Sequence, residues 1–136
     1  MEIIGRVTSE NIKELKENEV FVMGTNLLGR HGAGAARFAA KKFGAEEGVG
    51  FGPTGQCYAL PTKNEQIRTM KIEEIKPFIE LFITEAKLDP ERNYLVTEVG
   101  CGLAGFEPKD IAPLFKDAVD VPNIHLPQRF WDVILK

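Results

Sequence analysis

Two apolar runs of strand length, each followed by a glycine-rich turn, constrain the fold of this chain more than any other feature. Residues 20–23 (VFVM) precede the turn GTNLLGRHGAG, and residues 94–99 (YLVTEV) precede the turn GCGLAGF. An unbroken apolar run is typical of a strand that is covered on both faces. A helical pattern over residues 34–43 follows the first turn. Strand, turn and helix in this order predict an α/β fold with a mainly parallel sheet between helices.

The rest of the chain continues this alternation. Apolar residues three and four apart predict a long helix over residues 72–86, and Gly44 stands where a left-handed residue ends the preceding helix. The glycine-rich residues 45–56 are predicted to be irregular. The other predicted elements are a strand at 2–4, a helix capped by Thr8 or Ser9 that carries Ile12 and Leu15, a strand at 57–60 closed by Pro61, a helix capped by Asp110 with Pro113 as its third residue, and a strand at 123–126.

The composition is that of a globular protein. The 136 residues are 43% hydrophobic and 27% charged, which suits one domain over residues 1–136. No apolar run approaches the roughly 18 residues of a membrane span, and no secretory signal is visible, so we expect a soluble cytoplasmic protein. Cys57 and Cys101 form no ligand pattern, which predicts reduced thiols and no metal site. The net charge of −3 does not favour tight non-specific nucleic-acid binding, although a local basic patch stays open.

The glycine turns indicate that a ligand approaches the backbone. Gly32, Ala33 and Gly34 place unobstructed N–H groups at the amino end of a helix, which suits a phosphate; the alternative is a turn that packs closely against a strand. Ligands of parallel sheets bind beyond the carboxyl ends of the strands, where both turns fall. Two such turns favour a ligand with two phosphates. A dinucleotide-binding Rossmann fold is disfavoured, because Arg37 occupies the place of its third glycine.

The segments GTNLLGRHGAGAARFAAKKFG and VTEVGCGLAGFEPKDIAPLF resemble the two ligand loops of macro domains, which bind and hydrolyse ADP-ribose derivatives. HGAGAARFAAKKFG, CYALPTK and VGCGLAGF look most like the branch of the terminal ADP-ribose protein glycohydrolase and the antitoxin that removes ADP-ribose from DNA. The resemblance implies a macro-domain-like three-layer sandwich that needs no cofactor. It implies a substrate that is ADP-ribose or an ADP-ribosylated protein, nucleic acid or small molecule, and leaves open a partner ADP-ribosyltransferase.

The resemblance also assigns roles to individual residues. It implies that Lys63 acts on the anomeric carbon of the distal ribose. A lysine amine attacks such a carbon only when deprotonated, and burial favours that form. His31 is a candidate phosphate ligand or proton carrier. The residues expected to bind the ligand are Asn26, Gly32, Ala33, Gly34, Gly100, Cys101, Gly102, Leu103, Ala104, Gly105 and Phe106.

Several of these residues have simpler alternative roles. Asn26 is also a typical turn residue, because its side chain tolerates and supports unusual backbone angles. Phe106 suits core packing as well as a place beside the ribose. A histidine or lysine in a loop, such as His31 or Lys63, is ordinarily solvated. The residue types alone do not distinguish this role from a catalytic or phosphate-binding one.

Three positions depart from the family pattern, and they keep other functions open. Arg6 stands where the family usually has an aspartate that reads the adenine amino group, which puts adenine selectivity in question. Gly34 and Ala104 stand where hydrolytic macro domains carry acidic residues. Glu98 could supply the missing acid or base if its side chain points into the crevice. The main prediction is therefore a lysine-dependent ADP-ribosyl glycohydrolase. The alternatives are a non-catalytic nucleotide-binding module and a phosphatase or deacylase of modified ADP-ribose.

Overall fold

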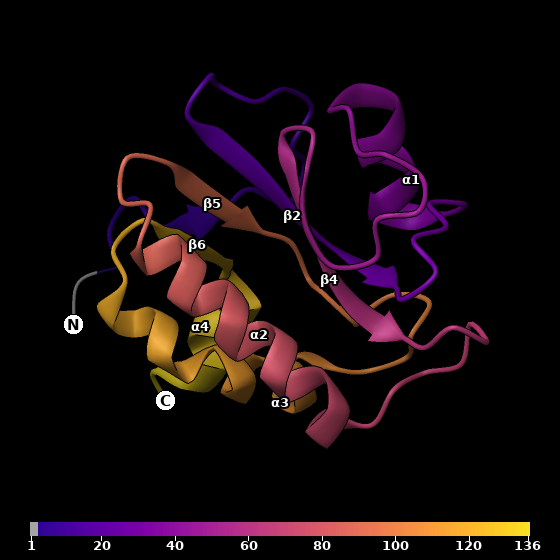
Figure 1. Ribbon diagram of the computed structural model, residues 1–136. Coiled ribbons are helices and arrows are strands. Elements are labelled where there is room, and N and C mark those ends of the chain that lie inside the picture. The colour runs from indigo at the N-terminus through magenta and orange to yellow at the C-terminus, as the bar shows by residue number, and fades with distance from the viewer. Residues whose placement is uncertain (1–2) are drawn as a thin grey trace.

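The computed structural model describes residues 3–136, which form a six-stranded sheet with helices on both faces (Figure 1). The strand order is β1-β6-β5-β2-β4-β3, and every neighbouring pair is parallel except β3 and β4. The predicted α/β class and mainly parallel sheet are confirmed. The elements are β1 (Val7–Thr8), β2 (Glu19–Asn26), α1 (Gly34–Lys42), β3 (Gly52–Thr54), β4 (Cys57–Lys63), α2 (Ile72–Lys87), β5 (Asn93–Val96), α3 (Pro108–Ile111), the 3-10 helix η1 (Ala112–Asp120), β6 (Ile124–Pro127) and α4 (Gln128–Ile134).

The central strand β2 is covered on both faces, as its unbroken apolar run predicts. Val20 and Val22 belong to the larger core, which also contains the buried residues of α2, η1 and α4. Phe21 and Met23 point to the opposite face and join a smaller core with Ala36 and other residues of α1 and β4. Because side chains alternate along a strand, one four-residue run supplies both cores.

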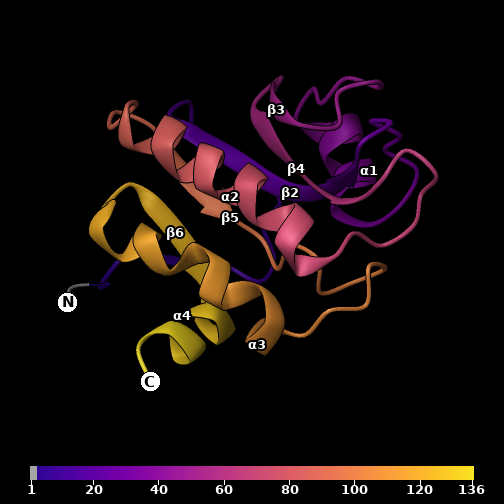
Figure 2. The same cartoon turned by 60° about the horizontal axis from the view of Figure 1, so that its bottom comes forward.

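The helices are divided unequally between the two faces. The long predicted helix is confirmed as α2, and its buried stripe contains Ile75, Ile79 and Phe82. Figure 2 shows α2, α3 and α4 grouped together, with α1 apart from them beyond β2 and β4. Gly44 has a φ of 79°, so the predicted left-handed residue does follow α1. Within residues 3–136, no helix combines the length and apolar character needed to cross a membrane.

The first part of the chain differs from the prediction. Glu2 lies outside the described residues, Ile3 and Ile4 are not in a strand, and the first strand is β1. The helix predicted after Thr8 or Ser9 is absent from the described chain, and residues 9–16 are irregular. Their apolar side chains, Ile12 and Leu15, pack instead against the smaller core. Two apolar residues three apart also fit an irregular segment that lies on a core, so the spacing was insufficient evidence for a helix.

The region from residue 45 to residue 63 is more regular than predicted. Gly52–Thr54 forms β3, which pairs antiparallel with the start of β4 across a two-residue turn containing Gly55. Pro61 does not close the next strand, because β4 continues to Lys63. The pairing with β3 ends at Ala59, so Pro61 has a sheet partner on one side only, a place that tolerates a missing N–H.

The second glycine turn begins earlier than predicted. The predicted strand at 94–99 is β5, which ends at Val96. The cap of the next helix is Glu107 rather than Asp110; the Asp110 carboxylate instead accepts the Glu107 N–H at 2.9 Å, so the two residues form a capping box. Pro113 lies at the start of η1, where an absent N–H is tolerated. The last strand, β6, lies one residue beyond the predicted range.

Arg6 is a structural clamp in the larger core. Only 8% of it is exposed, and its guanidinium lies 5.0 Å from the centre of the Trp131 ring. The guanidinium donates hydrogen bonds to four backbone carbonyls at the end of η1 and the start of β6, at 2.7 to 3.1 Å: those of Ala118, Val119, Val121 and Ile124. A cation suits the carboxyl end of a helix, where carbonyl groups lack partners. Arg6 thus joins β1 to η1 and β6.

Candidate functional site

Three parallel strands end side by side and open a cavity at one edge of the sheet. β5, β2 and β4 are neighbours, so their carboxyl ends meet there, as predicted for the two glycine turns. A cavity of about 350 Å³ lies at this edge, and we call it the strand-end cavity. Its lining residues are Gly24, Thr25, Asn26, Arg30, Gly32, Ala33, Gly34, Ala35, Ala36, Thr62, Lys63, Ile67, Thr97, Glu98, Val99, Gly100, Gly102, Leu103 and Ala104.

The first loop is shaped by the side chain of Asn26. Its Nδ2 donates to the Arg30 carbonyl at 2.9 Å, and its Oδ1 accepts the Arg30 N–H at 3.0 Å. Asn26 therefore holds the turn, as its alternative role predicts, and still lines the cavity. Beyond this turn, α1 begins at Gly34 without a side-chain cap or an acidic residue in its first turn. The amino end of α1 therefore faces the cavity with free backbone donors and a partial positive charge.

Close backbone contact between two loops fixes the far side of this turn. Gly29 has a φ of 73°, and an added Cβ would overlap backbone atoms of Gly48 and Val49. The Gly48 N–H donates to the Gly29 carbonyl at 2.9 Å. Gly50 lies against the carbonyls of Asn26 and Leu27 in the same way. These glycines let residues 46–50 support the loop that carries Gly32–34, which are predicted to bind the ligand.

Gly29→Ala should therefore lower the free energy of unfolding by about 2–4 kcal/mol, because alanine would be strained at this φ and would also displace backbone. Gly48→Ala is the matched control. Its φ is 94°, but an added Cβ there meets no atom within 4 Å, so only conformational strain of about 1–2 kcal/mol is expected. Urea unfolding of both variants measures the difference, and equal losses would show that the close approach contributes nothing.

The structure does not bring His31 to the cavity. Its side chain is buried, Nε2 lies 3.1 Å from the Val49 carbonyl, and Nδ1 lies 3.9 Å from a Glu47 carboxylate oxygen. The same carboxylate accepts the His31 N–H at 2.8 Å. His31 is thus neither a solvated loop residue nor a lining residue of the strand-end cavity. Its contacts tie the glycine loop to residues 47–49.

Lys63 is brought to the cavity, next to Asn26. The two residues are register partners at the ends of β4 and β2, and the Lys63 carbonyl accepts the Leu27 N–H at 2.9 Å. Lys63 is half-buried and lines the cavity. Within residues 3–136, no hydrogen bond or ion pair engages its amine. The amine is therefore available to a ligand.

The second loop presents backbone to the same cavity. Gly100 has a φ of 77°, and Gly100, Gly102, Leu103 and Ala104 are lining residues. The loop closes on itself, because the Phe106 N–H donates to the Gly100 carbonyl at 2.9 Å. It offers the cavity a short stretch of backbone with small side chains, apart from Leu103.

Three predicted ligand-binding residues of this loop lie outside the cavity lining. Cys101 and Phe106 pack against the larger core, which is the alternative role considered for Phe106. Burial raises the pKa of the Cys101 thiol to about 11, so this group stays protonated at neutral pH. Gly105, with a φ of 88°, serves the turn that closes the loop.

A second cavity adjoins the first. We call it the side cavity; its volume is about 750 Å³, and it shares Ala35, Thr97 and Glu98 with the strand-end cavity. Glu98 is held there by Arg129, whose Nε and Nη2 donate to the two carboxylate oxygens at 2.7 and 2.6 Å. The other lining residues are Thr8, Ser9, Glu10, Asn11, Ile12, Lys13, Phe21, Phe38, Lys42, Pro127 and Gln128. Arg6 is not among them, and its guanidinium is engaged by carbonyls of η1 and β6.

The paired Glu98 is a fixed anion rather than a proton donor. The hydrogen bonds from Arg129 lower the pKa of Glu98 below the usual carboxyl value. A carboxyl group with a lowered pKa stabilises the fold above its unfolded-state pKa and loses that contribution as the pH falls through its folded-state pKa.

Glu98→Gln should consequently be less stable than the wild type at pH 7, and the two should converge as the pH falls through the lowered folded-state pKa of Glu98. Chemical unfolding across this range tests the expectation, with Glu91→Gln as a control at an exposed turn carboxylate. If the difference in free energy of unfolding between the wild type and Glu98→Gln does not change with pH, the carboxylate charge does not contribute to stability through Arg129.

Several lining residues were not predicted from the sequence. Arg30, Thr62 and Thr97 lie within or beside the glycine turns and the segment CYALPTK, but their types are common in loops and gave no separate signal. Ile67 lies between the predicted strand at 57–60 and the predicted helix at 72–86, where no pattern marked it. Arg129 is joined to Glu98 only by the fold, so no local pattern could predict the pair.

Neither comparison with known proteins nor a metal site identifies the function of the cavity. No protein-family model, curated protein or solved structure matches this chain. Over residues 3–136, no group of three or more His, Cys, Asp or Glu side chains is placed to hold a metal ion.

Proposed function

We propose that the two cavities bind ADP-ribose or a related NAD-derived nucleotide, and that Lys63 acts in the hydrolysis of an ADP-ribosyl linkage. One observation carries the proposal: the glycine loop before α1, the glycine loop after β5 and the Lys63 side chain line the same cavity. These three parts lie far apart in sequence. The macro-domain resemblance predicts that they meet around one ligand.

The electrostatics of the strand-end cavity support a diphosphate. The uncapped amino end of α1 supplies backbone donors at Gly32–34, and the loop at 100–104 supplies more. Arg30 adds a cation to the lining, whereas the carboxylate of Glu98 is already held by Arg129. Backbone N–H groups and cations together match a pyrophosphate.

The size and continuity of the cavities support a ligand that occupies both. Small-molecule sites commonly measure about 300–1,000 Å³, a range that includes each cavity. The strand-end cavity holds Lys63, so we place the distal ribose and pyrophosphate there. The side cavity, which is partly lined by Ile12, Phe21 and Phe38, then receives the nucleoside half.

Lysine chemistry explains how hydrolysis proceeds without the acids of related enzymes. The Lys63 amine attacks the anomeric carbon of the distal ribose and forms a carbon–nitrogen bond. The bond from this carbon to the acceptor breaks, and the acceptor leaves with the electron pair and takes up a proton. Water then displaces the lysine and releases ADP-ribose. Gly34 and Ala104 need supply no side chain in this scheme.

A specific observation also favours a binding module. Among the described residues that line the strand-end cavity, Glu98 is the only carboxylate, and Arg129 holds both of its oxygens. A cavity without a free carboxylate suits recognition without turnover. In that case the protein retains the nucleotide and releases no product. Removal of a phosphate or an acyl group from modified ADP-ribose stays a further alternative for the same cavities.

Product analysis separates these functions. The protein is incubated with an ADP-ribosylated peptide, an ADP-ribosylated oligonucleotide, ADP-ribose 1″-phosphate and O-acetyl-ADP-ribose, and ADP-ribose is quantified by chromatography. Release from the peptide or oligonucleotide is the expected result. Release from the phosphate or acetyl ester alone would replace the glycohydrolase proposal with the phosphatase or deacylase alternative. Saturable binding without any product would establish the binding module.

A further inference from the structure

Ile67 has a backbone conformation that its side chain disfavours. Its φ is 59°, and among residues 3–136 it is the one non-glycine residue with a positive φ. A β-branched residue rarely adopts this left-handed conformation, because its Cβ substituents crowd the backbone. Strain of this kind persists only where the surrounding structure enforces it, and it is concentrated at functional sites.

The turn around Ile67 is firmly held. The Asn64 Oδ1 accepts the N–H groups of Gln66 and Arg68 at 2.9 and 3.0 Å, and the Ile67 N–H donates to the Asn64 carbonyl at 3.0 Å. Thr69 Oγ1 donates to the Ala104 carbonyl at 3.1 Å and so connects the turn to the second glycine loop. The strained conformation is therefore built into the rim of the cavity.

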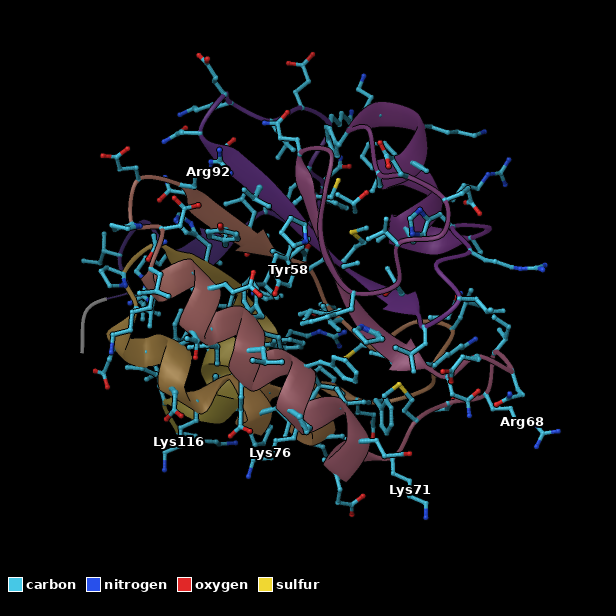
Figure 3. All side chains as sticks on the ribbon, viewed as in Figure 1. Tyr58, Arg68, Lys71, Lys76, Arg92 and Lys116 are labelled. Carbon is cyan, nitrogen blue, oxygen red and sulfur yellow. The ribbon has the colours of Figure 1, made fainter. Side chains whose placement is uncertain are left out.

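Core packing does not explain the strain. Ile67 is 41% exposed, and it lines the strand-end cavity together with Leu103, which is 74% exposed. Arg68, the next residue, does not line the cavity, and Figure 3 shows its side chain extending away from the body of the molecule. The turn therefore directs an apolar side chain towards the ligand site and an arginine towards solvent.

We propose that Ile67, with Leu103 on the adjoining loop, determines specificity by contacting the group that the distal ribose carries on its anomeric carbon. The inference rests on the proposed function, which places that carbon beside Lys63. Ile67 and Lys63 belong to the same turn and line the same cavity. Aliphatic side chains make no hydrogen bonds but pack against the face of a flat ring, so this rim selects an acceptor that presents a planar ring.

The test compares ADP-ribose with NAD, which carries a planar ring on the same anomeric carbon. Calorimetric titrations use the wild type, Ile67→Gly and Ile67→Asn, because glycine and asparagine tolerate a positive φ. Leu28→Ala is the matched control: Leu28 is 40% exposed and does not line the strand-end cavity. Thermal unfolding of each variant separates a contact with ligand from a structural role.

The wild type should bind both nucleotides. Both Ile67 variants should bind NAD about fivefold more weakly, through lost apolar contact, and keep the wild-type affinity for ADP-ribose. Their midpoint temperatures should match or exceed that of the wild type, since the strain is relieved. Three results would overturn this inference and leave the proposed function standing. They are equal effects of the Ile67 variants on both ligands, a marked fall in their midpoint temperature, and binding of ADP-ribose but not NAD by the wild type. A wild type that binds neither nucleotide would overturn the proposed function as well.

Discussion

Lys63→Ala should reduce the release of ADP-ribose at least about 100-fold and leave the affinity for free ADP-ribose within about threefold of the wild-type value. The reason is that the amine would be the nucleophile, whereas most contacts to the nucleotide would come from the two glycine loops. The amine has no partner within the described chain, so its removal leaves no buried group unsatisfied. Single-turnover release of ADP-ribose and calorimetric titration measure the two effects separately.

Two further variants make this result specific. Lys63→Arg keeps a positive charge but provides a poor nucleophile, so turnover should fall as in the alanine variant. Lys76→Ala removes an exposed lysine of α2, labelled in Figure 3, and should leave turnover unchanged. Full turnover by Lys63→Ala would remove Lys63 from the mechanism. Loss of affinity together with turnover would make Lys63 a binding residue instead.

Arg6→Ala should lower the free energy of unfolding by about 3–5 kcal/mol, the largest stability change that we expect from a single polar side chain here. The substitution removes the Arg6 hydrogen bonds from four carbonyls at the end of η1 and the start of β6. The carbonyls of Ala118 and Val121 keep a backbone N–H donor each, and those of Val119 and Ile124 lose their side-chain donor. It also removes the cation that lies against the Trp131 ring. Urea unfolding monitored by tryptophan fluorescence measures the loss, because Trp131 is the only tryptophan of the chain.

Arg92→Ala provides the comparison for this prediction. The Arg92 side chain is 62% exposed and lies 3.8 Å from Asp89, so its removal should cost less than about 1 kcal/mol. Arg6→Lys should fall between the two, since an ammonium group retains the charge but cannot reach all four carbonyls. A loss at Arg6→Ala no larger than that at Arg92→Ala would contradict the role of Arg6 as a clamp.

Elements with a strong, continuous pattern could be predicted from the sequence. Three patterns predicted their elements because local preference and core packing agree there. They are the apolar run of β2, the apolar stripe of α2 and the glycines that flank α1. The region at 9–16 was predicted wrongly because its two apolar residues, Ile12 and Leu15, are placed by contact with the smaller core rather than by helix formation. The role of Pro61 depends on how far β3 extends alongside β4, which is a tertiary feature.

The candidate site could be predicted only where its residues carry backbone chemistry. Glycine turns after strands predict a crevice at the ends of those strands. Lys63 was predicted to be a site residue only through the resemblance of the segment CYALPTK. The burial of His31 depends on residues 47–49, and the pairing of Glu98 with Arg129 depends on α4. Arg6 stands where the resembling family usually has a base-reading aspartate, which put adenine selectivity in question. In the structure the Arg6 side chain lies in the larger core and donates to carbonyls at the end of η1. Only the fold brings these groups together.

The most direct test of the central claim is a calorimetric titration of the protein with ADP-ribose, with ADP alongside. Gly32 lines the strand-end cavity, and an added Cβ there meets no atom within 4 Å, so Gly32→Glu should fold and block the site with bulk and negative charge. Gly32→Ala is its matched control. We expect saturable binding of one ADP-ribose by the wild type and Gly32→Ala, weakened at least about tenfold in Gly32→Glu. No binding by the wild type, or equal binding by Gly32→Glu, would contradict the assignment of this cavity to ADP-ribose.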